Sequence, residues 1–527
     1  MNGSPDPAND SDPIWKWLGG KWSLVALCLI LLIVALYVEE DWRGAAEWNQ
    51  TQAEIAAAGE SLDPKKFIPP PVPDDQSFAA LPIFKVEMIS DWDADAVGMK
   101  RAFARINPYS IPTYPETSHA RDQLPFLGNW QKEQEPDLPT IQMQMAGVCY
   151  SHGVKVSAGT TPLDLFELLC PALADLRAAD QTHPLCRFDV FYSFRPAIEM
   201  PWASMAGCRQ LVTVLAYEER LALLQHRPDL ALADLKIGWK VDSGLRNEAL
   251  LLSDIIARAC QASQLQVIAQ GLSQHVWNQQ QLAELDGDLG AVDDLAAARL
   301  GVRGNVAILA VPSTDYFKKH RSMLPDMLFG PPSLGKPRPP AISEFIATSL
   351  SMLLPDGWMD EWKAQDATIN LLGTVKIVDP EKHRAYPEQE VKTLHLIEDS
   401  KKTWLWNTLT LRNVRFSVEE MQRVAYAQVQ IDEGRIACRL ERFYLDHGHY
   451  PAALAELTPA YGTGLPHDVM NGEPYHYKLL PDGTYLLYSV AWDQKDDGGK
   501  EGAGEYHYYL DDPDWPWHNH PQAAKSK

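Results

Sequence analysis

The fold is decided by residues 417–447, which read SVEEMQRVAYAQVQIDEGRIACRLERFYLDH. Ser417 and Glu420 have the spacing of a capping box, which predicts that a helix begins at Ser417. Apolar residues then recur at helical spacing, namely Met421, Val424, Ala425, Val429, Ile436, Leu440, Phe443 and Leu445. Gly448 stands where the residue after a helix needs a positive φ. The sequence therefore predicts one long helix that ends at His447.

A short helix and a β-hairpin are expected after this long helix. Pro451 suits a helix start, and Leu454 and Leu457 can then pack back on the long helix. The stretch EPYHYKLLPDGTYLLYSVAWD alternates apolar and polar residues on both sides of a Pro-Asp-Gly turn at 481–483. Residues 417–527 are therefore expected to form a small α+β domain with an acidic, glycine-rich tail.

Two histidines flank the glycine at the end of the long helix. His447 and His449 could belong to a metal site or only to the corner between two helices. Because the spacing fixes no third ligand, we expect the corner, with hydrogen-bonded or solvated rings. His518 and His520, in WPWHNHP, are interpreted in the same way.

Three strings in this region carry a resemblance to a known family. They are LERFYLDHGHYPAALAELTPAY, PHDVMNGEPYHYKLL and YSVAWDQKDDGG. In their order and over about a hundred residues they resemble the globular domain of type II secretion major pseudopilins. The resemblance implies a terminal loop that binds Ca²⁺. Its candidate ligands by position are Asp493, Asp496, Asp497 and one of Asp511 or Asp512.

Calcium at this loop is one of two expectations that stay open. Carboxylates and backbone carbonyls on glycine-permitted turns suit a hard cation. However, Ala491 and Gln494 stand where the family has glycine, and the loop is longer here. The other expectation is a solvated acidic turn.

Residues 161–328 read as a helical body. Thr161 and Pro162 are typical of a capped helix start. Residues 207–241 predict two helices joined at 226–229, with apolar faces formed by Leu211, Val214, Tyr217, Leu221 and Leu224 and by Leu230, Ala233 and Ile237. This pair resembles a tetratricopeptide unit, although the chain has no regular 34-residue period. We expect a mainly α body of helical hairpins that is TPR-like.

One transmembrane helix is predicted near the N-terminus, at residues 14–38. The run WSLVALCLILLIVALYV carries no charge and approaches the ~20 residues that cross a bilayer. Lys16 and Lys21 precede it and three acids follow it, so the positive-inside rule leaves residues 1–13 in the cytoplasm. No small-residue cleavage site follows, which favours a retained anchor over a signal peptide. The chain is expected in a bacterial inner membrane, with its bulk on the periplasmic side.

The remaining segments have less distinct patterns. Residues 39–78 predict a helix and then the proline-rich stretch IPPPVPDDQSF, an extended spacer that would hold the body away from the lipid. Residues 79–160 are expected to be irregular, and 329–416 to be a Pro/Gly loop with connecting helices. Ser333 and Lys336 match an SxxK pattern, but the surrounding prolines and glycine favour a loop over a catalytic helix. The order of anchor, spacer, helical body and end module resembles a family of single-pass anchored bacterial proteins, a likeness that implies no activity.

Charge and cysteine content limit the partners. The net charge of -23 makes nucleic acid an unlikely partner, because phosphate binding needs concentrated Lys and Arg. Six of the seven cysteines follow the anchor. If a disulfide forms, Cys170 and Cys186 are the nearest pair after allowing for local geometry, and buried free thiols are the alternative.

Three functions remain open from the sequence. The HExxH, GxSxG, Walker and GxGxxG motifs do not occur, which favours a membrane-anchored interaction or scaffold protein with an envelope protein partner. An exported hydrolase-like enzyme, with a cleft between the helical body and the C-terminal domain, is the first alternative. A calcium-stabilised structural module is the second.

Overall fold

The computed structural model describes residues 21–84, 125–127, 137–151, 153–195, 197–200, 203–321, 353–400, 407–500 and 513–517. These residues are mainly helical, with a small sheet near the C-terminus, as predicted. The chain divides into two compact units. The first comprises Met1–Ala57 and Thr314–Gln365, and the second comprises Ala58–Ser313 and Asp366–Lys527. Each unit is described by itself.

The first unit is built on one long helix. Helix α2, Lys21–Ala57, contains the uncharged run and continues through the polar residues after it. Its later part contacts α15, Asp356–Ala367, where a Cβ on Gly44 would collide with the Gly357 carbonyl. Only glycine lets two backbones approach so closely. The Gly357 amide also donates to Asp41 at 2.8 Å, so this crossing is fixed by polar contacts as well.

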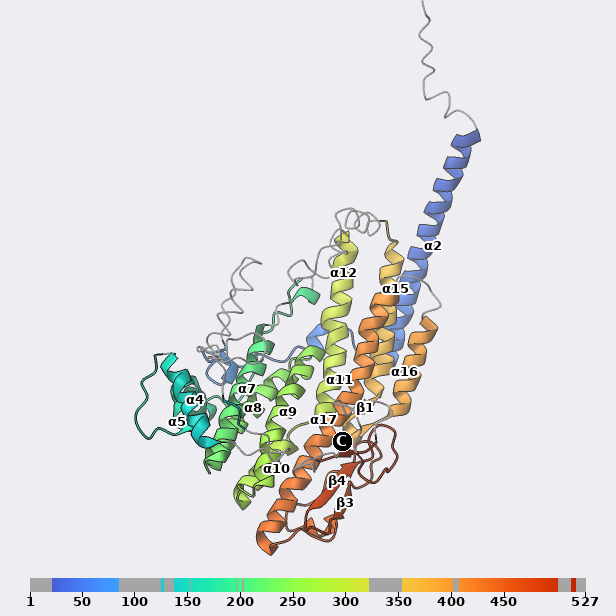
Figure 1. Cartoon of the computed structure of the whole chain (residues 1–527). Coiled ribbons are helices and arrows are strands. Elements are labelled where there is room, and N and C mark those ends of the chain that lie inside the picture. The colour runs from blue at the N-terminus through green and yellow to red at the C-terminus, as the bar shows by residue number, and fades with distance from the viewer. Residues whose placement is uncertain are drawn as a thin grey trace, which may run out of the picture. The chain divides into compact units, whose positions relative to one another are not determined.

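The second unit contains the helical body. Its helices are α4 Leu138–Ser151, α5 Pro162–Leu169, α6 Ala172–Asp180, α7 Ala203–Leu224, α8 Pro228–Arg246, α9 Leu251–Ser273, α10 Gln279–Gly290 and α11 Asp294–Gly304. The π-helical segment Asn305–Ala310 follows, and α12, Val311–Lys319, begins in this unit, while its residues from Thr314 onward belong to the first. Helices α7, α8 and α9 pack on one another, and α9, α10 and α11 pack on α17 (Figure 1). The predicted pair of helices joined at 226–229 is confirmed, and α4 is a helix within residues expected to be irregular.

Helix α17, Asn407–His447, is the long helix predicted from the sequence, but its predicted start is wrong. It begins at Asn407, and Ser417 and Glu420 are buried inside it. Glu420 does not cap the helix; it accepts a hydrogen bond from Arg258 of α9 at 2.9 Å. The end is confirmed, because the helix stops at His447 and Gly448 has a φ of +76°.

Beyond α17 lie the predicted short helix and hairpin. A 3₁₀ turn, Leu454–Leu457, follows, and its Leu457 is buried. Strands β3 His476–Leu479, β4 Tyr485–Ser489 and β5 Trp515–Pro516 form an antiparallel sheet in that order. Before α17, the two-residue strands β1 Val378–Asp379 and β2 Arg384–Ala385 pair, and α16, Pro387–Ser400, follows them. The strands at 378–385 and β5 were not predicted.

The proline-rich segment is not a free spacer, which corrects the expectation from its composition. Phe67 and Ile68 pack against a buried cluster that includes Met200, Leu250 and Ile308. Arg303 of α11 binds both carboxylate oxygens of Glu60, at 2.7 and 2.6 Å. Prolines restrict this segment to an extended conformation. The apolar contacts and the Arg303–Glu60 ion pair fix the segment against the helical body.

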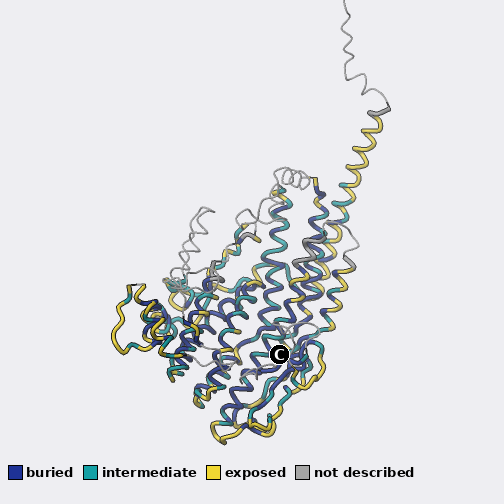
Figure 2. Tube along the Cα trace, in the orientation of Figure 1, coloured by how far each residue is buried: buried dark blue, intermediate teal, exposed yellow. Residues whose placement is uncertain are grey.

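One described helical run, Gln279–Lys319, is long and apolar enough to cross a membrane by length and composition. Half of its most apolar window is buried, because α10 and α11 pack on α17 and α9. This is what core helices of a folded body show. By contrast, the described apolar residues near the start of α2 are exposed, as the yellow stretch of Figure 2 shows.

Candidate functional site

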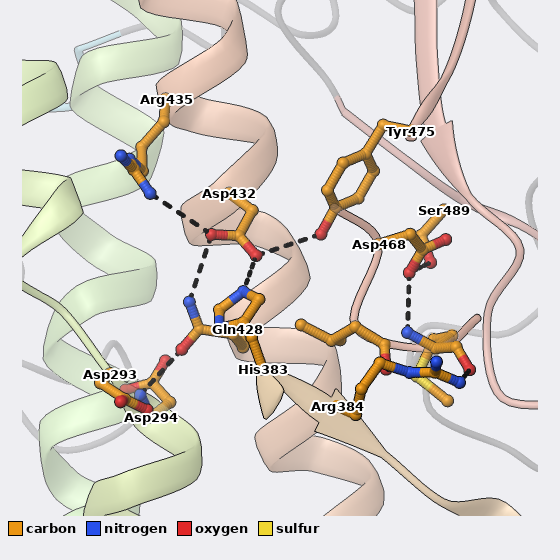
Figure 3. Close-up of polar contacts among 12 residues, drawn as sticks. Asp293, Asp294, His383, Arg384, Gln428, Asp432, Arg435, Asp468, Tyr475 and Ser489 are labelled. Carbon is orange, nitrogen blue, oxygen red and sulfur yellow. Dashed lines mark hydrogen bonds and ion pairs between the residues drawn. The ribbon is translucent and has the colours of Figure 1, made fainter. Parts of the chain in front are cut away.

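A buried carboxylate on α17 is the centre of a polar network. Asp432 is 1% exposed, and one of its oxygens accepts a hydrogen bond from His383 Nε2 at 2.7 Å and from the Tyr475 hydroxyl at 3.3 Å. The other oxygen accepts from Gln428 Nε2 at 3.3 Å. Figure 3 shows these side chains converging from three segments far apart in the sequence. A buried carboxylate is stable only with such donors around it.

Local structure explains how His383 reaches this carboxylate. The 3₁₀ turn Pro380–Lys382 is capped by Asp379, and His383 follows it with a φ of +52°. This left-handed conformation is uncommon for a residue other than glycine. It connects β1 to β2, so the tight hairpin places the imidazole over α17. Arg384, the next residue, donates to the carbonyls of Val469 and Met470 at 3.3 and 3.1 Å.

The network continues from Asp432 into the helical body. Gln428 Oε1 accepts from the backbone amide of Asp294, at the start of α11, at 2.8 Å. The Asp294 carboxylate accepts from Gln261 of α9 at 2.8 Å, and Gln261 also donates to Asp242 of α8 at 3.3 Å. A continuous line of hydrogen bonds thus joins the C-terminal sheet, α17, α11, α9 and α8.

A second joint on α17 repeats the arrangement. Glu441 accepts from His275 Nδ1 at 2.6 Å and from the Tyr450 hydroxyl at 3.0 Å. His275 follows α9 with a φ of +51°, and its ring stacks on Tyr444 at 4.6 Å. In both joints a left-handed histidine from one segment and a tyrosine from another bind one buried acid of α17. The helix therefore carries two matched polar clamps.

The charges of these clamps depend on pH. Burial lowers the pKa of His383, but the hydrogen bond and charge of Asp432 raise it further, so that it lies above its ordinary value. The bond to Glu441 raises the pKa of His275. Asp293 raises and Arg435 lowers the pKa of His383 from neighbouring elements. Because both pKa values are raised, the ion pairs stabilise the fold fully below the ordinary histidine pKa, and this stability is lost as pH rises through the raised values.

Asp468 holds the C-terminal sheet in a related way. It is fully buried and accepts from the amides of Met470 and Val490 and from the Ser489 hydroxyl, all at 2.9–3.0 Å. Burial raises its pKa, although these donors act in the opposite direction. Asp468 stands in the string PHDVMNGEPYHYKLL that was quoted from the sequence, and its carboxylate joins that segment to β4.

The sequence-predicted histidines lie in a corner, as expected. His447 Nδ1 lies 3.0 Å from the Phe443 carbonyl, and His449 Nδ1 lies 2.9 Å from the Tyr450 carbonyl. His518 and His520 lie outside the described residues, as do Ser333 and Lys336. Among the described residues, no three His, Cys, Asp or Glu side chains are placed to hold a metal ion.

The acidic loop is placed only in part. Asp493 pairs with Lys495 at 2.9 Å, and Asp496 accepts from the Tyr488 hydroxyl and the Gly498 amide, both at 2.9 Å. Asp497 contributes its backbone amide, which donates to Asp514 at 3.0 Å. Asp511 and Asp512 lie outside the described residues. The calcium assignment stays a prediction.

Two residues of this loop that are not glycine have left-handed backbone conformations. Ala491 and Gln494 have φ values of +54° and +59°. Glycine adopts this region without strain, whereas alanine and glutamine do not. Gln494 is held there by a hydrogen bond from its Nε2 to the Met470 carbonyl at 2.6 Å.

The cysteines form no disulfide in the structure. All seven are free thiols, and Cys149, Cys170, Cys208, Cys260 and Cys438 are buried. The pair Cys170 and Cys186 is not bridged. Burial raises the pKa of both thiols to about 12, so neither is an ionised nucleophile near neutral pH.

Sequence reasoning missed the residues of both clamps. His275 and His383 stand in short polar turns, and nothing in their local sequence points to a partner. Asp432 and Glu441 carried a weak signal, since each is an acid among the apolar positions of the long helix.

Comparisons with family models, with curated proteins and with solved structures find no match to this chain.

Replacing Asp432 with asparagine tests the first clamp. Without the carboxylate, burial becomes the dominant influence on the ring, since Asp293 and Arg435 act in opposite directions, and the pKa of His383 should fall. The free energy of unfolding should drop by about 1–3 kcal/mol, because a charged hydrogen bond is weakened. NMR titration of the histidine ring protons measures the change.

Glu441→Gln is the matched control, since it should lower the pKa of His275 and leave His383 unchanged. An unchanged His383 pKa in Asp432→Asn, or equal shifts of both histidines in either variant, would contradict the assignment of the clamps.

Proposed function

We propose that this protein is anchored in a bacterial inner membrane by α2 and acts by binding envelope proteins with its exported body. The observation that supports the anchor is the exposed apolar surface in the first half of α2. Its exposed side chains, each 47–68% accessible, are Leu24, Val25, Leu27, Leu29, Ile30, Leu31, Leu32, Ile33, Val34, Leu36 and Val38. A helix that is apolar on all sides and exposed is stable in lipid rather than in water.

The dimensions and flanking charges support the same proposal. Residues 21–38 of α2 span about 27 Å at 1.5 Å per residue, close to the ~30 Å hydrocarbon layer of a bilayer. Trp42 is 73% exposed just beyond the run and suits the headgroup region. Lys16 and Lys21 before the run, and the acids at 39–41 after it, favour a cytoplasmic N-terminus.

The part of α2 that follows the apolar run is tied to α15. Glu40 accepts from the Trp358 indole at 3.0 Å, and Arg43 pairs with Glu361 at 3.1 Å. Farther along, the Lys363 ammonium lies 4.7 Å from the centre of the Trp48 ring. These contacts give the proposed anchor a folded attachment within its own unit rather than a loose tether.

A binding role is supported by the helix pairs and by the way that the body is assembled. Helices α7 and α8 form an antiparallel-type hairpin across a three-residue turn, the kind of unit that TPR-like proteins use for partners. Helix α17, the 3₁₀ turn and the β3–β4 hairpin fit the proposed pseudopilin-like module, which would link the protein to secretion or envelope assembly.

Crosslinking in intact cells should recover at least one envelope protein with this chain, whereas recovery of the chain alone would speak against binding.

An exported hydrolase remains the alternative from another class. His275 is its best described candidate, because Glu441 binds Nδ1 while the His275 side chain is 41% exposed. Such a carboxylate–imidazole pair can serve as a general base. We favour binding because this imidazole also stacks on Tyr444 and joins two segments, which is a structural task.

The anchor is tested with paired charge insertions. Leu29→Arg with Ile33→Arg places two charges at the centre of the run, each costing about 2.5–3.5 kcal/mol in a membrane. The variant should leave the carbonate-resistant membrane fraction, which immunoblotting detects.

Asn49→Arg with Gln52→Arg, on exposed positions of the same helix beyond the run, is the control and should stay in the membrane. Equal membrane retention of both variants would contradict the proposal that α2 anchors the chain. Protease added to spheroplasts should digest the body, and protection of the C-terminal half would reverse the proposed topology.

A calcium-stabilised loop is a second candidate property, favoured by one observation. Asp514 Oδ2 accepts from the amides of Asp497 and Gly499, while its buried Oδ1 has no hydrogen-bond partner among the described residues. An orphaned carboxylate oxygen is costly unless a proton or cation meets it. Asp514 would then be a ligand that the sequence comparison with pseudopilins did not single out.

Chelation tests this property. Removing calcium should lower the thermal midpoint, by the equivalent of about 2.7 kcal/mol when calcium stands about a hundredfold above its Kd. Asp514→Asn should abolish the response, and Asp482→Asn, in the β3–β4 turn, should keep it. A midpoint that ignores the chelator in the unmodified protein would end the calcium proposal.

A further inference from the structure

Three buried carboxyl groups lie at the junction of α6, α7 and α8, and two of them bind one guanidinium. Glu218 and Glu219 of α7 and Asp234 of α8 are all 0% exposed. Arg177 of α6 donates from a single Nη1 to Glu218 Oε2 and to Asp234 Oδ1, at 2.8 Å each. One positive charge therefore pairs with two buried acids, while a third buried acid, Glu219, neighbours both of them.

Glu219 is the member without a partner. Neither of its carboxylate oxygens has a hydrogen-bond partner among the described residues. Its neighbours Glu218 and Asp234 are also acids, and together with burial they raise its pKa well above the ordinary value. An ionised carboxylate here would lie beside like charges in a dry interior, which is strongly unfavourable.

The other two acids share their surroundings. Glu218 and Asp234 bind the same guanidinium nitrogen, and the other oxygen of each carboxyl has no hydrogen-bond partner among the described residues. Burial and the charge of Glu218 raise the pKa of Asp234 well above its ordinary value, so that one of the two carboxyls keeps a proton. Because Arg177 balances one negative charge, the cluster is neutral when one carboxylate is ionised and two protons are bound.

The elements around the cluster supply little further charge. From α5, Glu167 lies 3.4 Å from Arg177 Nη2 and is partly exposed. On α7, Arg220 donates to Gln270 of α9 at 3.2 Å. Also from α9, Gln264 donates to the Leu235 carbonyl at 3.0 Å, which leaves its Oε1 as an unpartnered acceptor. Arg177 thus pairs directly with Glu218 and Asp234.

We propose that the junction of α6, α7 and α8 is a proton-loaded switch, with one proton on Glu219 and one shared by Glu218 and Asp234. Loss of these protons leaves two uncompensated negative charges between α7 and α8. Their repulsion and their need for water then open this helix pair. The open state is favoured as pH rises, and the closed state returns when the protons rebind.

A biological role for this switch requires that the body is exported, and in this respect the inference rests on the proposed function. A body outside the inner membrane meets the pH of its surroundings, and α7 and α8 form the helix pair proposed for binding. The two proposals fail separately, since the experiments below use the purified full chain and do not depend on its location.

Infrared spectroscopy detects the proton on Glu219 directly. The difference spectrum between the unmodified protein and Glu219→Gln, in detergent at neutral pH, should show the loss of a protonated-carboxyl C=O band. Asp175→Asn, which removes an exposed acid elsewhere on α6, should not show this loss. Loss of a carboxylate band in Glu219→Gln would overturn the proposal.

Hydrogen exchange, corrected for the intrinsic effect of pH, tests the opening. Between pH 6 and 9, the equilibrium constant for local opening of α7 and α8 should rise with pH. The expected rise is about tenfold per pH unit for each proton that the opening releases. Glu219→Gln should reduce the increase by at least about tenfold at pH 9, and Asp175→Asn should not. Glu219→Met provides a second non-titrating variant of similar volume if the glutamine variant folds poorly. An increase that is the same in the unmodified protein and both Glu219 variants would overturn the switch.

Discussion

The second unit depends on ionisable side chains that the fold buries and must therefore pair or protonate. Its buried acids outnumber its buried bases, which are Arg258 and Arg439 among the described residues of this unit. Several acids lie on α17, where Glu420 contacts α9 and where Asp432 and Glu441 each hold a histidine and a tyrosine. Because α17 also packs on α9, α10 and α11, the helical body and the C-terminal sheet share one central helix. The stability of either part is thus linked to the same set of polar contacts.

Patterns that act within a few residues were predictable from the sequence. Helical spacing located α7, α8 and most of α17, and Gly448 marked the end of α17 because a left-handed residue follows that helix. The alternation around Pro481-Asp482-Gly483 located the β3–β4 hairpin. The predicted start of α17 failed because Ser417 and Glu420 match a capping box in sequence, while tertiary packing continues the helix back to Asn407.

Contacts between distant segments were not predictable in this way. His275 and His383 reach α17 only because two turns adopt left-handed conformations, which no local motif announces. The proline-rich stretch was expected to hold the body away from the lipid, but it contacts the body through distant residues such as Arg187, which donates to the Pro69 carbonyl at 3.1 Å. Asp234 was missed because the helical pattern was read for apolar residues, whereas the α7–α8 interface also buries acids. The acidic loop was predicted by likeness, and only Asp493, Asp496 and Asp497 of its proposed ligands are placed.

The pH dependence of thermal unfolding tests this account most directly. Burial raises the pKa of Asp242 and Glu248 to about 7 and of Asp254 to about 6, and the pKa values of His275 and His383 are raised as well. The folded chain therefore binds more protons than the unfolded chain, whose acids titrate near pH 4, and its stability must fall as pH rises through this range. The unfolding midpoint of the full chain should be higher at pH 5 than at pH 8. A midpoint that instead rises from pH 5 to pH 8 would contradict the account.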